Sequence, residues 1–201
     1  MAKKESTFIN MVLVLFLVTA VASTALGFVY ELTKEPIAAS KLAKQNSAIN
    51  SVVPGFDNQP NEEMYTIESE EGYELKVFPA RKEGELIGVA IETLTMSGFS
   101  GEIKVMVGMK PDGTIINYEV LEHKETPGLG TKMDDWFKSE KGNRSIIGKN
   151  PGEDNLYVTK DNGEVDAITA ATISSRAFLD AVRRAYETYQ NNPKTEEGGE
   201  Q

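Results

Sequence analysis

Hydrophobic residues fill the first part of the chain almost without interruption. From Phe8 to Tyr30 the sequence contains no charged residue in 23 positions. As a helix, this run extends for about 34 Å at 1.5 Å per residue, which is enough to cross a hydrocarbon core of about 30 Å. The pattern therefore predicts a single transmembrane helix.

A cleaved signal peptide is the alternative interpretation of this run. Lys3 and Lys4 precede an apolar stretch, and the residues from Ala20 to Ala22 satisfy the small-x-small cleavage rule. However, the apolar character continues beyond this point to Tyr30, an aromatic residue of the kind found at membrane interfaces. We therefore favour a retained anchor.

Lysines, whose distribution helps to set the orientation of a membrane span, lie on both sides of the predicted helix. Lys3 and Lys4 precede it, whereas Lys34, Lys41 and Lys44 follow it. This near balance does not decide the topology by charge alone. Retention of the short N-terminal arm in the cytoplasm is the simpler insertion route, and it predicts that the rest of the chain lies outside the cytoplasm.

A second helical pattern follows the span. Pro36 can open a helix at its first turn, and apolar residues recur at helical spacing until Pro54 and Gly55. The spacing predicts a juxtamembrane helix over residues 36–52. The polar, acidic segment from Asp57 to Tyr73 is predicted to be a loop.

The next part of the chain alternates between apolar and polar residues in four runs. Short turn sequences that contain glycine separate the runs, which is typical of an antiparallel meander. The last apolar pattern, from Ile173 to Tyr189, has a single apolar face and predicts a helix packed on the sheet. The fold class is therefore α+β. The four predicted strands cover residues 73–80, 85–95, 102–109 and 114–122.

These elements divide the chain into four predicted parts. The first two are an N-terminal arm with the transmembrane helix (residues 1–30) and a juxtamembrane helix with the acidic loop (residues 31–71). A domain with the sheet and its packing helices follows (residues 72–190). Residues 191–201 contain no apolar side chain and are predicted to be a disordered tail.

Composition excludes several classes of chemistry. The 201 residues contain no cysteine, which excludes disulfides, zinc–thiolate sites, iron–sulfur clusters with the usual ligands and covalent c-type haem. The one histidine, His123, has no second imidazole with which to form a metal pair. The net charge of −10 and the scattered basic residues argue against nucleic acid binding.

Two short motifs exceed what the scaffold requires. The first is HKETPGLGTKM, residues 123–133, in which Pro127 and Gly128 favour a tight turn. The second is DAITAATISS, residues 166–175, which places two threonines and two serines before the last helix. A helix start needs only one capping hydroxyl. Each motif alone is typical of an ordinary turn or helix cap.

Together the two motifs resemble the FMN-binding domain of ion-translocating respiratory complexes. ETPGLG follows a strand, D-x-x-[ST]-[GA]-A-T precedes a C-terminal helix, and GFSGEIKVMV (residues 98–107) matches a Gly-aromatic-x-Gly segment. With the anchor included, the whole chain resembles the G subunits of the Rnf electron transport complex. The C subunits of the sodium-translocating NADH:quinone reductase are close relatives of that family.

The resemblance implies a covalent flavin site. In the family the FMN phosphate is esterified to the last threonine of the motif, which is Thr172 here, and Ala170 replaces the usual glycine. Ser174, Ser175 or Thr169 would then serve the helix cap and the remaining phosphate oxygens. The resemblance further implies that Phe99 is a weaker ring-lining candidate. The alternative interpretation is that Phe99 belongs to the core. The other predicted cofactor-binding residues are Asp166, Thr169, Ala171 and Ser174 in the second motif, and Glu125, Thr126, Leu129 and Gly130 near the ring.

The resemblance also implies a function. The protein would be a single-pass subunit of the inner (cytoplasmic) membrane, with an extracytoplasmic flavin domain that relays electrons between partner subunits. The complex would couple ferredoxin:NAD electron transfer to Na⁺ or H⁺ translocation, and the subunit alone would turn over no soluble substrate. Attachment of FMN would need a flavin transferase, because a threonine hydroxyl without a base is a weak nucleophile.

Three alternatives stay open at this point. The chain could be an FMN-binding redox sensor or accessory domain, a component similar to the C subunit of the quinone reductase, or an anchored binding domain without flavin.

Overall fold

The structure is a computed structural model that describes residues 7–192. It separates into two compact units, one up to Lys44 and one from Gln45 onward. Lys3 and Lys4, like residues 193–201 of the predicted tail, lie outside the described residues.

The first helix, α1, spans Phe8–Val52 as one continuous element. The prediction that Pro36 opens a separate helix is therefore wrong, since Pro36 lies inside α1. The alanines and lysines that follow it favour helix strongly enough to tolerate the loss of one backbone donor. The helix ends just before Pro54, as the sequence predicts. Among the described helices, only α1 is long and apolar enough to cross a membrane.

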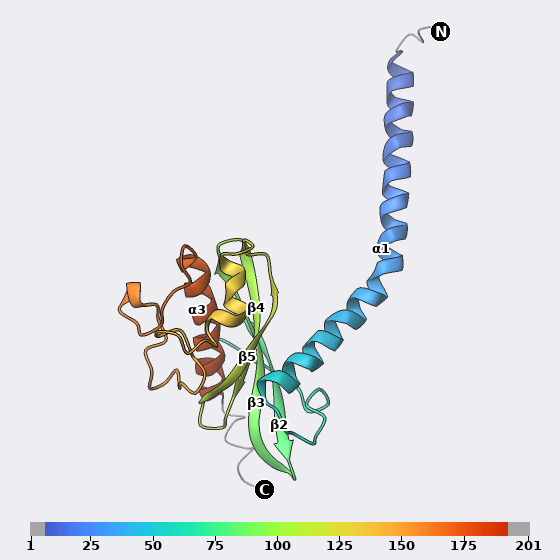
Figure 1. The fold of residues 1–201 in the computed structure, drawn as a ribbon. Helices are drawn as coiled ribbons and strands as arrows, with labels where there is room; N and C mark the ends of the chain where they lie inside the picture. The colour runs from blue at the N-terminus through green and yellow to red at the C-terminus, as the bar shows by residue number, and fades with distance from the viewer. Residues whose placement is uncertain (1–6, 193–201) are drawn as a thin grey trace. The chain divides into compact units, whose positions relative to one another are not determined.

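Five antiparallel strands form the sheet in the order β1-β2-β3-β4-β5, which confirms the predicted meander (Figure 1). The first strand lies within the segment predicted to be a loop. It has four residues, of which only Ile67 is buried, so the sequence carries too short an alternation to predict it. The strands are β1 (Tyr65–Glu68), β2 (Glu74–Lys82), β3 (Glu85–Gly98), β4 (Gly101–Met109) and β5 (Ile115–His123).

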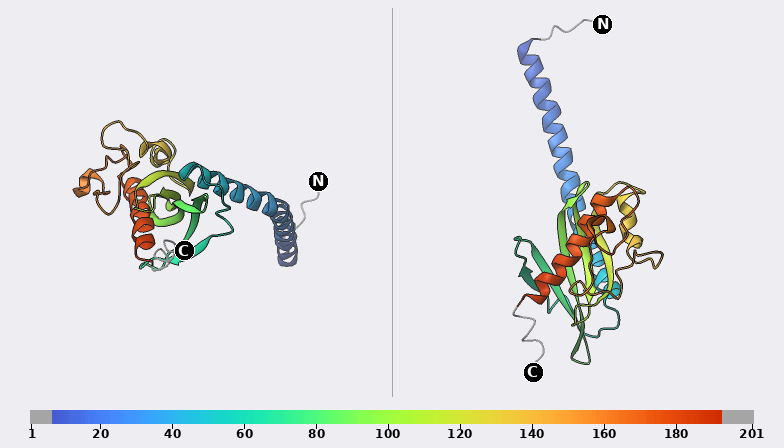
Figure 2. Two further views of the ribbon diagram at one scale, coloured as in Figure 1. Left: turned by 90° about the horizontal axis from the view of Figure 1, so that it is seen from below. Right: turned by 90° about the vertical axis from the view of Figure 1, so that its left-hand side faces the viewer.

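Helix α3, Thr172–Gln190, covers one face of the sheet, and the last turns of α1 cover the other (Figures 1 and 2). Strand β4 is buried on both sides as a result: Val105 and Val107 belong to the cluster beneath α3, whereas Met106 belongs to the cluster beneath α1. A side-chain carbon at Gly108 would overlap the carbonyl group of Val52. Gly108 therefore lets the end of α1 approach the sheet closely.

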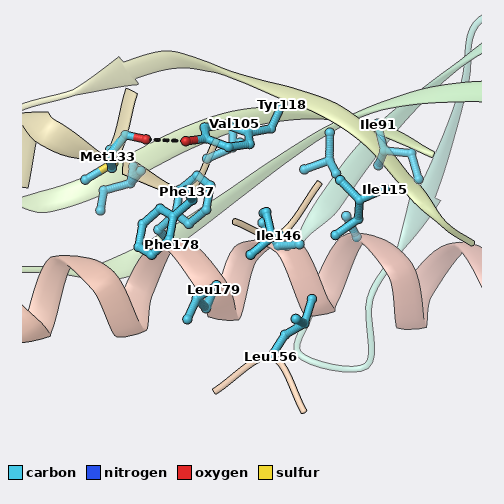
Figure 3. Close-up of a cluster of buried hydrophobic side chains, with 14 of the residues drawn as sticks. Ile91, Val105, Ile115, Tyr118, Met133, Phe137, Ile146, Leu156, Phe178 and Leu179 are labelled. Atoms are coloured by element: carbon cyan, nitrogen blue, oxygen red, sulfur yellow. Dashed lines mark hydrogen bonds between the residues drawn. The ribbon is translucent and has the colours of Figure 1, made fainter. Parts of the chain in front are cut away.

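Aromatic rings connect α3 to the sheet in the main core (Figure 3). The Phe137 and Phe178 rings stack with centroids 4.6 Å apart, and Tyr118 meets Phe178 edge-on at 4.7 Å. The buried Tyr118 hydroxyl donates a hydrogen bond of 2.6 Å to the carbonyl oxygen of Met133. Met133 begins the short helix α2, Met133–Trp136, which follows the 3-10 turn Gly130–Lys132. These contacts fix the chain after β5 against α3.

The strand register brings distant segments to one end of the sheet. Ile103 of β4 pairs with His123, the last residue of β5, and Gly98 pairs with Gly101 across the β3–β4 turn. The β3–β4 turn and the exit from β5 therefore lie side by side.

Candidate functional site

A cavity of about 310 Å³ lies at the N-terminal end of α3. Three segments form its walls: the β3–β4 turn, the loop after β5, and the residues around the start of α3. The fold thus brings the two motifs of the sequence analysis together. The lining residues are Phe99, Glu125, Thr126, Leu129, Gly130, Ala170, Ala171, Thr172, Ile173 and Ser174.

The lining contains most of the residues predicted to bind the cofactor. Phe99 also lies here and is 66% exposed, so the alternative that it belongs to the core is wrong. Ala170 and Ile173 line the cavity but were not among the predicted contacts, although both stand within or beside the second motif. The predicted residues in the lining are Glu125, Thr126, Leu129, Gly130, Ala171, Thr172 and Ser174.

Asp166 and Thr169 lie apart from the cavity lining. The Asp166 carboxylate accepts a 3.0 Å hydrogen bond from the backbone N–H of Asn143, and its own N–H donates to the Asn143 carbonyl at 2.7 Å. The Asp166 carbonyl accepts a 2.8 Å bond from the Trp136 indole. Asp166 thus joins the long loop before α3 to α2, whereas Thr169 is exposed.

A tight turn shapes the wall that follows β5. The Leu129 N–H donates to the Thr126 carbonyl at 3.1 Å, and Gly128 adopts φ +75° at the third turn position. A positive φ at this position defines a type II turn and favours glycine. The Gly128 N–H donates to the Thr131 hydroxyl at 3.0 Å, which closes the turn. The turn leaves the Leu129 side chain partly exposed at the cavity.

A buried carboxylate connects the three walls. Glu125 is 4% exposed, and its Oε1 accepts a 2.9 Å hydrogen bond from the Ser100 N–H in the β3–β4 turn. Its Oε2 accepts a 2.5 Å bond from the Ser174 hydroxyl on α3. A side-chain carbon at Gly98 or Gly130 would stand 2.8 Å or 2.6 Å from these oxygens. Both glycines are therefore required for the carboxylate to sit between the walls.

The start of α3 differs from the predicted cap. Within residues 7–192, no side chain makes a capping hydrogen bond at Ala171, the N-cap of α3. The Ser174 hydroxyl donates a hydrogen bond to the Glu125 carboxylate. The Ser175 hydroxyl accepts a hydrogen bond from the Ile168 N–H and donates one to the Ala171 carbonyl. The expectation that these hydroxyls cap the helix is therefore wrong. An uncapped helix N-terminus presents free N–H groups and a partial positive charge, which favour an anion.

Thr172, the first residue of α3, carries a hydroxyl at the cavity. Its Oγ1 accepts a 3.2 Å hydrogen bond from Nζ of Lys160. Sequence reasoning missed Lys160, because it stands twelve residues earlier, in a loop region with no motif. The site thus combines a hydroxyl, an ammonium group and a helix N-terminus, a set of groups that fits a phosphate ester.

Ala170 occupies a backbone conformation that glycine adopts more easily. Its φ is +62°, in the left-handed region. The glycine that the resemblance implies at this position would adopt this φ without the steric cost of the methyl group that Ala170 carries.

Comparison with known proteins gives the site a family. The family model described as the FMN-binding domain matches residues 98–187, a range that contains every residue of the cavity lining. A protein of Vibrio atlanticus, named as the G subunit of an ion-translocating oxidoreductase complex, is 39% identical over 186 residues, which cover 86% of each chain. The chain belongs to the family of G subunits of ion-translocating oxidoreductase complexes.

Other members of this family align over similar lengths. The corresponding G subunit from Aliivibrio fischeri (strain ES114) is 36% identical over 199 residues, or 92% of each chain. A protein of Acetobacterium woodii, named as the G subunit of a Na⁺-translocating ferredoxin:NAD⁺ oxidoreductase complex, is 32% identical over 194 residues, which are 90% of this chain and 91% of that one. The resemblance to Rnf G subunits and the predicted FMN-binding α+β fold are therefore confirmed.

Proposed function

We propose that this protein is a membrane-anchored electron-transfer subunit that carries FMN as a phosphate ester of Thr172. It would act with the other subunits of a complex that couples ferredoxin:NAD electron transfer to translocation of Na⁺ or H⁺. The position of the Thr172 hydroxyl supports this attachment site, because it lies at the cavity and at the uncapped start of α3. The family membership supports the role in the complex.

The residues of the site suit separate parts of the flavin. Thr172 supplies the ester oxygen, and the N-terminus of α3 stabilises the phosphodiester charge by about 0.3 to 1 kcal/mol. Thr126 and Leu129 orient the ring from the type II turn, and Phe99 contributes an apolar surface that limits water access. FMN supplies the redox chemistry when it is bound, whereas the protein supplies orientation and electrostatic tuning.

Attachment requires a separate enzyme in this proposal. Lys160 donates a hydrogen bond to Thr172 Oγ1, and a group that donates its proton does not act as the base that an alcohol nucleophile needs. We therefore propose a flavin transferase that uses FAD as the FMN donor, with magnesium. The Thr172 oxygen would bond to the FMN phosphorus while the pyrophosphate bond of FAD breaks. AMP would leave, and the threonine proton would pass to a base of the transferase. A covalent link retains the cofactor outside the cytoplasm, where a dissociated flavin would be lost by dilution.

The proposed location is the inner membrane, with one span and an extracytoplasmic flavin domain. The long apolar helix α1 supports the single span. A thiol introduced by Gln201→Cys should react with an impermeant reagent in intact cells. Protection of that thiol until lysis would reverse the proposed orientation.

Substitution of Thr172 tests the attachment. Wild-type protein co-expressed with a flavin transferase should keep flavin fluorescence after denaturation. Its peptide with Thr172 should be heavier by one FMN less one water. Thr172→Ala should fold without covalent flavin, and Thr172→Ser should be partly labelled because the hydroxyl remains. Thr169→Ala is the matched control and should label. Denatured wild type without flavin, or a label on Thr169 or Ser174, would disprove the assignment.

A further inference from the structure

We infer that Lys160 is the cation that pairs with the phosphodiester of FMN at Thr172. This inference rests on the proposed attachment at Thr172 and adds a binding residue that lies outside both sequence motifs. The chemistry that Lys160 would recognise is a singly charged phosphate ester at the start of α3.

The position of Lys160 is the first observation. Its Nζ lies 3.2 Å from Thr172 Oγ1, the atom to which phosphorus would bond directly. The free oxygens of the ester would stand two bonds beyond Oγ1, through the phosphorus, within reach of the flexible ammonium group. In the described structure, the hydrogen bond to Oγ1 therefore already places the cation beside the site of the negative charge.

The backbone around Lys160 is held in place by contacts on both sides. Lys160 is the middle residue of a 3-10 turn, Thr159–Asp161. The turn follows an isolated bridge between Val158 and Val165, and the Thr159 N–H donates to the Val165 carbonyl at 2.9 Å. Asp161 then accepts two hydrogen bonds of 2.6 Å from Arg176 on α3. Lys160 is thus presented to α3 by a fixed segment.

The charges around Thr172 supply a second, independent observation. Lys160 and Arg176 carry two positive charges, whereas Asp161 carries one negative charge. The Arg176 hydrogen bonds hold the pKa of the Asp161 carboxyl below its usual value, and the charge of Lys160 acts in the same direction. Arg176 is engaged by both Asp161 oxygens. A phosphodiester with one negative charge would bring this group of three residues to neutrality, with Lys160 as its partner.

A purely structural role would leave a different signature. If Lys160 only bonds the Thr172 hydroxyl and compensates the charge of Asp161, its removal should affect the protein equally with and without flavin. If Lys160 pairs with the phosphodiester, the effect should depend on the flavin. The two forms of the same chain therefore distinguish the roles without a second substitution.

The experiment uses the full chain in detergent, produced with and without a flavin transferase. Mass spectrometry first establishes whether FMN is present on Thr172. Lys160→Gln should lower the thermal unfolding midpoint of the flavin-bearing form by about 2 to 4 °C, and that of the flavin-free form by less than about 1 °C. Lys160→Arg should restore the unfolding midpoint of the flavin-bearing form. High salt should reduce the difference in midpoint between wild type and Lys160→Gln in that form.

Lys110→Gln is the matched control. Lys110 is exposed at the β4–β5 turn. This turn lies near the other end of α3, because a side-chain carbon at Gly113 would overlap Tyr186 and approach Gln190. Its loss should shift both forms equally. Equal shifts for Lys160→Gln in the two forms, or no rescue by arginine, would overturn the inference and leave the attachment at Thr172 intact. A chain without FMN on Thr172 would overturn both proposals.

Discussion

The Ser174 hydroxyl donates a 2.5 Å hydrogen bond to Oε2 of the buried Glu125. This bond joins the first turn of α3 to the loop that follows β5, two segments that are 49 residues apart in the sequence. The other carboxylate oxygen is held by the Ser100 N–H of the β3–β4 turn. Glu125 therefore stabilises the walls of the cavity relative to one another before any flavin is bound.

Ser174→Ala should destabilise the flavin-free protein by about 1 to 3 kcal/mol, because it leaves a buried carboxylate oxygen without its donor. Urea unfolding followed by tryptophan fluorescence measures this loss. Thr169→Ala is the control, since Thr169 is exposed, and it should change the free energy of unfolding by less than about 0.5 kcal/mol. Equal effects of the two substitutions would show that the Glu125–Ser174 bond adds nothing to stability.

Ala170→Gly should increase the free energy of unfolding by up to about 1 kcal/mol. Alanine at φ +62° carries a conformational cost of roughly 1 to 2 kcal/mol, which exceeds the additional chain entropy of glycine, about 0.5 to 1 kcal/mol. Ala171→Gly is the control and should not stabilise the chain, because Ala171 has a negative φ of −136°. A less stable Ala170→Gly protein in urea unfolding would contradict the strain argument.

Alkaline conditions should destabilise the wild type partly through Tyr118. Burial raises the pKa of the Tyr118 phenol, so its contribution is fully present below the unfolded pKa of about 10 and is lost as pH rises through the folded value. The loss approaches about 1.4 kcal/mol per pH unit. Tyr118→Phe removes this dependence but also removes the bond to Met133.

The variant should therefore be less stable than wild type at pH about 8, and the difference should narrow above pH about 10. Burial also raises the pKa of Tyr65, to about 12, but this group titrates in both proteins and cancels in the comparison. Urea unfolding at the two pH values measures the change. A constant difference between the proteins would mean that Tyr118 does not titrate on unfolding.

Gly108→Ala should destabilise the flavin domain by about 1 to 3 kcal/mol, a range typical of overpacked cores. The added methyl group would overlap the Val52 carbonyl at the end of α1 and force the helix away from the sheet. Gly27→Ala is the control, because a side-chain carbon at that position would meet no described atom within 4 Å apart from its chain neighbours and the nearby backbone of its own helix. Unfolding of both variants in detergent checks the expectation, which fails if Gly108→Ala is as stable as the control.

Regular patterns made much of the fold predictable. Strands β2 to β5 each contain nine or more residues, many of them buried. Helix α3 has a single apolar face, so the positions of these elements follow from their apolar runs and the turns between them. Strand β1 was not predicted because it is short. Its position is determined by pairing with β2 and not by a pattern of apolar residues in its own sequence. The continuity of α1 through Pro36 was missed because local proline rules were outweighed by the helical preference of the flanking sequence.

The residues of the site likewise fall into those that the sequence predicts and those that it does not. Thr172 and the ETPGLG turn could be found because each belongs to a motif whose residues are contiguous in the sequence. Lys160 could not, since its position depends on a bridge between Val158 and Val165 and on the Arg176–Asp161 pair. The roles of Ser174 and Ser175 were misjudged for a related reason: their partners come from Glu125 and Ile168, outside the helix that the hydroxyls were expected to cap.

The last turns of α1 belong to the interior of the flavin domain, with Ala48, Ile49 and Val52 buried against Phe78 and its neighbours on the sheet. A water-soluble version of the domain must therefore keep these turns. A chain shortened to begin at Gln45 would retain this half of the core, whereas one that begins at Pro54 would expose an apolar sheet face and should aggregate. Proteolysis that removes the membrane anchor should likewise leave a stable fragment only when it cuts before Ala48.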